Sequence, residues 1–142
     1  MTLTQPILTP LSGGKYLLKE NYAYEWSLSS HVTRRLTIKA GFISDIASVP
    51  PVFWALGFPA DGLHRAAAVM HDALYQARGH LPSEWVVYRE SIAGRDLVAT
   101  PARFSRRDAD RLFGRMMREA GVPQWRRRTM YRAVRLCSWL FW

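Results

Sequence analysis

Six side chains in three separate segments of the chain could together perform acid–base or metal-assisted chemistry. An imidazole beside a carboxylate, with hydroxyl groups and further carboxylates nearby, supplies the groups that proton transfer and divalent-metal binding both use. The six candidate catalytic or ligand residues are Asp45, Ser48, His71, Asp72, Tyr75 and Asp110.

The first interpretation of these residues is metal-dependent hydrolysis. Imidazole nitrogens and carboxylate oxygens are ligands of divalent metals, and a metal that keeps one position for water makes hydroxide available near neutral pH. The neighbours His71 and Asp72, with another histidine upstream and an aspartate on another helix, resemble the H…HD…D arrangement of HD-type phosphohydrolases. The expected ligands of a divalent metal ion are His64, His71, Asp72 and Asp110.

Two further interpretations need no metal. In one, Ser48 is a nucleophile, His71 is its base and Asp45 or Asp72 orients the base, which requires a hydrogen bond between serine and histidine. Ser48 lacks the G-x-S-x-G elbow that often presents such a serine. In the other, the polar residues are structural, because aspartate and serine satisfy backbone N–H groups in turns and a histidine on a helix flank can tie elements together.

The elements that must position these residues are read from hydrophobic periodicity. Apolar and polar residues alternate along 32–42, and short aromatic runs at 15–18 and 22–26 precede them, which predicts strands. Helical patterns are expected at 48–56, 61–78, 105–120 and 124–141, and strand patterns around 84–100 predict an inserted β-hairpin. The prediction is one α+β domain spanning 1–142, in which an N-terminal antiparallel sheet packs on about three main helices. It is β-rich over 1–42, helical over 48–78 and 105–141, and has its hairpin insertion at 79–104.

The helical patterns also indicate which way the candidate residues face. At about 100° per residue, His64, His71 and Tyr75 share one flank of their helix, and Asp72 points about 100° further round. Asp110 lies on the flank of an apolar stripe on the next long helix. We therefore expect the six candidate residues to form one partly buried polar cluster. On the last helix the expected inward side is Trp125, Thr129, Ala133, Leu136, Cys137 and Leu140.

The charge of the chain predicts anionic partners. Twenty Lys and Arg residues outnumber eleven Asp and Glu, for a formal charge of +9, which favours nucleic acid, a nucleotide or other phosphate-bearing small molecule, or a membrane surface. The alternative is that the charge only aids solubility or complements an acidic protein neighbour. The outer side of the last helix could grip phosphates through arginines, with a tyrosine to stack on a base. These expected substrate-binding residues are Arg127, Arg128, Tyr131, Arg132 and Arg135.

Other features narrow the expected location and assembly. The single cysteine, Cys137, allows no internal disulfide and no cysteine-based zinc site. Neither a signal peptide nor a run of about 18 apolar residues is recognised, so we expect a protein of the host cytoplasm or of a virion, without a membrane span. The apolar end at 139–142 predicts one of three contacts: packing on the core, a dimer contact, or contact with a membrane surface.

Several motifs resemble one family. They are the run G-F-I-S-D-I-A-S-V-P at 41–50, the run H-D-A-L-Y at 71–75, the run R-D-A-D-R-L-F at 107–113 and G-V-P at 121–123. The chain is similar over roughly 32–142 to the small bacteriophage and prophage family catalogued as domain of unknown function 1353. The resemblance implies a phage origin and shared positions at the six candidate residues, but no mechanism.

The predicted function is a phage-encoded metal-dependent hydrolase of a phosphate ester or nucleotide, for example a host signalling nucleotide. The alternative is a non-catalytic phage component of the tail, baseplate or lysis apparatus, in contact with other phage proteins.

Overall fold

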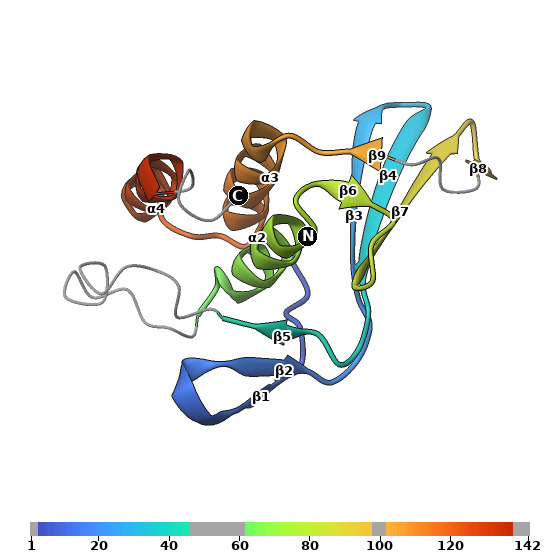
Figure 1. The fold of residues 1–142 in the computed structure, drawn as a ribbon. Coiled ribbons are helices and arrows are strands. Elements are labelled where there is room, and N and C mark those ends of the chain that lie inside the picture. Colours follow the sequence, from blue (N-terminus) through green and yellow to red (C-terminus); the bar gives the residue numbers. More distant parts are fainter. Residues whose placement is uncertain (1–2, 46–61, 98–101, 138–142) are drawn as a thin grey trace.

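The computed structural model describes residues 3–45, 62–97 and 102–137 (Figure 1). Antiparallel strands dominate the N-terminal part, and three α-helices follow among the described residues, so the predicted α+β class is confirmed. The helix expected at 48–56 lies outside the described residues. Among those residues, no helix has both the length and the apolar character needed to cross a membrane.

A four-stranded antiparallel sheet forms one side of the molecule. Its order is β3 (Tyr22–Ser29), β4 (Val32–Ile38), β7 (Val86–Ile92) and β8 (Arg95–Leu97). Leu36 on β4 pairs with Tyr24 on one side and with Tyr88 on the other, and all three side chains are buried. Because alternate residues of a strand face the same side, this register gives the sheet one apolar face, which packs on the helices.

The expected hairpin is present as β7 and β8, but it is part of the main sheet. Ala93 and Gly94 connect the two strands, and both have positive φ, as a two-residue type I′ turn requires. β7 also pairs with β4 along its whole length, so the hairpin extends the N-terminal sheet. The strand expected at 32–42 ends at Ile38, ahead of Gly41, whose φ is +92°.

Short strands form two smaller sheets. β1 (Leu8–Pro10), β2 (Tyr16–Leu18) and β5 (Ile43–Ser44) form one, which lies beside α2 in Figure 1, and a 3₁₀ turn at Ser12–Gly14 links its first two strands. β6 (His80–Leu81) and β9 (Ala102–Arg103) form the other. The first sheet matters for the site because β5 leads directly into Asp45.

The helices are α2 (Arg65–Gln76), α3 (Arg106–Glu119) and α4 (Gln124–Cys137). In Figure 1, α2 and α3 lie next to each other beside the main sheet, and α4 lies on the side of α3 away from that sheet. The capping box predicted from Ser105 and Asp108 is present: the serine hydroxyl accepts from the Asp108 amide, and the Asp108 carboxylate accepts from the Ser105 amide. These local bonds explain why α3 begins where the sequence indicated.

The inward side of α4 differs from the prediction. Of the residues expected to face inward, Ala133 is buried, but Trp125 and Leu136 are 59% and 73% exposed, and Met130 is buried although it was not among them. Tyr131, expected on the solvent side, packs on α3 instead, since a Cβ placed on Gly114 would lie 3.3 Å from its Cδ2 atom. The absence of a side chain at Gly114 therefore allows the close approach of the tyrosine ring and rotates α4 away from the expected orientation.

Replacing this glycine tests the contact between α3 and α4. We expect Gly114→Leu to lower the free energy of unfolding by about 1–3 kcal/mol, because the added side chain overlaps the Tyr131 ring. This would occur although leucine favours a helix over glycine by roughly 0.8 kcal/mol. Urea denaturation measures the change, and Arg118→Leu at an exposed position of α3 is the control. Unchanged or higher stability of Gly114→Leu would contradict the contact.

Candidate functional site

Asp110 is the centre of the main polar group of the structure. Its carboxylate is fully buried where α2, α3 and α4 meet. The Nε2 atom of His71 lies 2.8 Å from Oδ1, and the Tyr75 hydroxyl donates to the same oxygen at 2.6 Å. Arg135 donates from Nη1 to Oδ2 at 2.9 Å. Donors from two other helices thus occupy both oxygens of the one buried carboxylate.

This network keeps Asp110 ionised. Burial by itself would raise the pKa of the Asp110 carboxyl, but the hydrogen bonds from His71, Tyr75 and Arg135 outweigh it and hold that pKa below its usual value. The hydrogen bond to Asp110, followed by the charge of Asp110 and the nearby hydroxyls of Tyr131 and Tyr75, raises the pKa of the Arg135 guanidinium. An ionised carboxylate only accepts hydrogen bonds, so the Nε2 atom of His71 must carry a proton.

His71 is held in one orientation but retains one reactive atom. Its ring packs between those of Tyr75, 4.1 Å away, and Phe113, 5.1 Å away, and 14% of the side chain is exposed. Within the described parts of the chain, no hydrogen bond reaches its Nδ1 atom. In a neutral imidazole protonated at Nε2, Nδ1 carries a lone pair that can accept a proton or bind a metal. A buried carboxylate that accepts a hydrogen bond from one imidazole nitrogen fixes the orientation of the ring, both in histidines that act as bases and in histidines that bind metals.

Asp72 belongs to a second polar group on another side of α2. Its Oδ2 atom accepts hydrogen bonds of 2.9 Å from the Ser44 hydroxyl and from the backbone amide of Asp45, with the Gln76 amide at 3.5 Å. Burial raises the pKa of the Asp72 carboxyl, and these hydrogen bonds offset only part of that rise. The group ties the end of β5 to α2, and Asp45 contributes its backbone.

The structure therefore distributes the candidate residues over two hydrogen-bonded groups. His71, Tyr75 and Asp110 meet in one, and Asp45 and Asp72 meet in the other. The separation agrees with the expected 100° between His71 and Asp72. Ser48 lies outside the described residues.

The expected metal ligands are not gathered in the described part of the chain. His64 is buried at the N-cap of α2, two turns or about 10 Å along the helix from His71. The Asp110 oxygens already accept from three donors. Among residues 3–45, 62–97 and 102–137, no group of three His, Cys, Asp or Glu side chains could hold a metal ion. The described residues alone do not fit a metal centre, and metal binding stays a prediction.

The arginines of α4 reach this site in part. Arg135 contacts Asp110 directly, and Arg128 and Arg132, which are exposed, precede it at seven and three residues. That spacing puts all three on one side of the helix. Arg127 is half-buried, and Tyr131 packs on Gly114, so neither continues this exposed row.

Sequence reasoning missed three contributors to the two groups. Ser44 and Gln76 bind Asp72, and Phe113 packs on His71. A signal for Gln76 was available, since it lies four residues after Asp72 and residues at that spacing are neighbours on a helix. Nothing in the sequence alone indicates that the Ser44 hydroxyl faces α2.

Acid should weaken the contribution of Asp110 to stability. A carboxyl whose pKa is lowered by folding stabilises the protein above the unfolded value of about 4 and loses that effect as the pH falls through the folded value. At pH 7 we expect Asp110→Asn to lower the free energy of unfolding by about 2–3 kcal/mol, since hydrogen bonds to a charged group are lost. Urea denaturation should show that the difference in the free energy of unfolding between wild type and Asp110→Asn becomes smaller as the pH falls from 6 to 3. A difference that stays constant would contradict this.

Asp72 should respond differently to the same kind of substitution. Its raised pKa shows that burial disfavours the charge, and an asparagine oxygen can still accept from Ser44 and Asp45. We expect Asp72→Asn to change stability at pH 7 by less than about 1 kcal/mol, and Asp72→Ala to cost about 1–3 kcal/mol because the buried Ser44 hydroxyl loses its acceptor. Thermal or urea denaturation of both variants measures this. Equal losses would show that the carboxylate charge itself is needed.

Comparison with known proteins places the chain in a family without assigning an activity. No curated protein matches the sequence significantly. No solved structure matches it either. One family model, described as "Protein of unknown function (DUF1353)", matches residues 16–134, a span that includes both polar groups except Arg135. The chain belongs to this family of proteins of unknown function, DUF1353.

Proposed function

We propose that the chain is a hydrolase of phosphate esters in which His71 transfers the proton and Asp110 positions its imidazole. The observation that carries the proposal is the hydrogen bond of 2.8 Å between His71 Nε2 and the buried Asp110 carboxylate, while no hydrogen bond from residues 3–45, 62–97 or 102–137 reaches Nδ1. Histidine is the side chain best suited to proton transfer near neutral pH.

The chemistry follows from this pairing. Nδ1 of His71 accepts a proton from a water molecule as its oxygen forms a bond to phosphorus. The ester P–O bond breaks, and the imidazolium returns the proton to the leaving oxygen, so the histidine is regenerated. Asp110 stabilises the imidazolium through Nε2, as an orienting carboxylate does in other histidine-dependent hydrolases.

The surroundings of His71 favour an anionic substrate. Arg135 lies on the far side of the same carboxylate, and Arg128 and Arg132 continue from it along α4. Guanidinium groups bind phosphate oxygens through paired N–H donors and stabilise the charge that develops during transfer. The formal charge of +9 acts in the same direction over longer distances.

The proposed reaction does not require a divalent metal, and metals enter only as additions to the assay. The described residues do not fit a metal centre by themselves, so the proposed proton transfer uses no metal. If the protein binds a metal, Nδ1 of His71 is its available ligand atom, and the metal would supply an activated water.

The activity can be measured on simple phosphate esters. We expect hydrolysis of p-nitrophenyl phosphate, bis(p-nitrophenyl) phosphate or one of a panel of linear and cyclic nucleotides, each assayed with EDTA and with Mg²⁺, Mn²⁺ or Zn²⁺. His71→Asn should lower kcat/KM by about 10²–10⁴-fold, since it removes the proton-transferring group. His80→Asn, at an exposed position on β6, is the matched control and should leave the rate unchanged.

A second candidate is a non-catalytic component of a phage particle. The observation that favours it is that Asp110 is fully buried and joins three helices, an arrangement that can serve structure alone. In that case no substrate of the panel is hydrolysed, and His71→Asn lowers the melting temperature without any other effect. Activity that survives His71→Asn in a folded protein would also exclude the proposed mechanism.

A further inference from the structure

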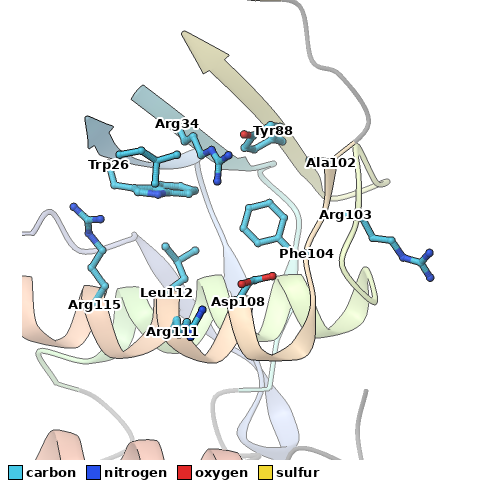
Figure 2. A pocket seen from close by; sticks show the side chains of 11 residues that line it. Trp26, Arg34, Tyr88, Ala102, Arg103, Phe104, Asp108, Arg111, Leu112 and Arg115 are labelled. Atoms are coloured by element: carbon cyan, nitrogen blue, oxygen red, sulfur yellow. The ribbon is translucent and has the colours of Figure 1, made fainter. Parts of the chain in front are cut away.

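A pocket of about 490 Å³ lies between the main sheet and α3, apart from the polar groups described above. In Figure 2, Trp26 and Arg34 project into it from the sheet, Leu112 projects from α3, and Phe104 lies between the two. Its volume is within the range of small-molecule sites, about 300–1,000 Å³.

The walls of the pocket are aromatic and aliphatic. Trp26, Tyr88 and Leu112 are buried parts of the core whose side chains reach the pocket, and Phe104 packs edge-on against Tyr88 at 5.8 Å between ring centroids. Leu28, at the margin, is 52% exposed. A flat apolar group entering here would therefore contact ring edges and faces in a geometry that aromatic groups favour.

Four arginines surround this apolar lining. Arg34 is paired with Glu90, and Arg115 with Glu119, so their charges are partly neutralised. The lining carboxylate, Asp108, is held in the capping box of α3. Arg103 and Arg111 are exposed and take part in no salt bridge within the described part of the chain. The pocket thus combines an apolar lining with an excess of positive charge.

We propose that this pocket binds a mononucleotide, whose base packs on Phe104 and Leu112 and whose phosphate contacts Arg111. Guanidinium groups recognise phosphate through paired N–H donors, and aromatic side chains hold bases by stacking without requiring one particular base. A nucleotide matches both the ring-lined wall and the exposed guanidinium group of Arg111.

The proposed pocket is separate from the His71 site. Asp110 precedes Leu112 by two residues, which places it about 160° away around α3. The helix itself therefore stands between the two, and a ligand in the pocket would not touch His71. The inference goes beyond the proposed function and does not depend on it.

Isothermal titration with AMP, adenosine and inorganic phosphate tests the proposal. We expect one saturable site for AMP, and binding at least about tenfold weaker for adenosine and for phosphate, since each lacks half of the recognised groups. Arg111→Gln should weaken AMP binding about ten- to hundredfold through loss of a charge-assisted contact. Because Arg111 is exposed, this variant should fold like the wild type.

Controls separate the pocket from general attraction to a basic protein. Arg89→Gln removes one charge from the same sheet, but from the face opposite Tyr88, and should leave AMP binding unchanged. His71→Asn should also leave it unchanged, which distinguishes the pocket from the proposed hydrolase site. Absence of saturable AMP binding would overturn the proposal. Equal loss in Arg111→Gln and Arg89→Gln would overturn it too, as would phosphate binding as tightly as AMP.

Discussion

The buried charge of Asp110 constrains how the three helices can pack. An unpaired carboxylate in the interior would cost several kcal/mol, so His71, Tyr75 and Arg135 must all be in place when the helices come together. The next turn of α3 repeats the alignment, because Gly114 follows Asp110 by four residues and Tyr131 precedes Arg135 by four. Ion pair and close packing thus fix one register between α3 and α4.

The second polar group on α2 differs from the Asp110 group because its environment disfavours the charged form of the carboxyl group. Asp72 sits where burial disfavours its charge, and its partners are a hydroxyl and a backbone amide. This group attaches β5 to α2 and so positions the chain at Asp45 relative to His71. α2 therefore contacts two polar environments. One lowers the pKa of Asp110 through hydrogen bonds, and the other raises the pKa of Asp72 through burial.

Local interactions account for what could be predicted from the sequence. The start of α3 follows from Ser105 and Asp108, and the hairpin follows from its strand patterns. The predicted orientation of α4 was wrong in part: Ala133 is buried as expected, but Trp125 and Leu136 are exposed and Met130 is buried instead. The sequence of α4 alone does not reveal that Gly114 on α3 leaves room for the Tyr131 ring. Similarly, the sequence placed Asp110 on a helix flank, whereas its full burial depends on α4 covering it.

α3 lies between the two proposed sites, the buried polar group at His71 and the pocket at Arg111 and Leu112. One side of the helix carries Asp110, which is fully buried and whose carboxylate accepts hydrogen bonds from His71, Tyr75 and Arg135. The other side carries Leu112 and Arg111 and borders an open pocket whose lining comes from three strands of the main sheet and from β9. No sequence motif marks that pocket, because its residues are brought together only by the packing of α3 on the sheet. In the two proposals, proton transfer would use the enclosed imidazole of His71 on the first side, and reversible binding of a small anion would use the exposed Arg111 on the second.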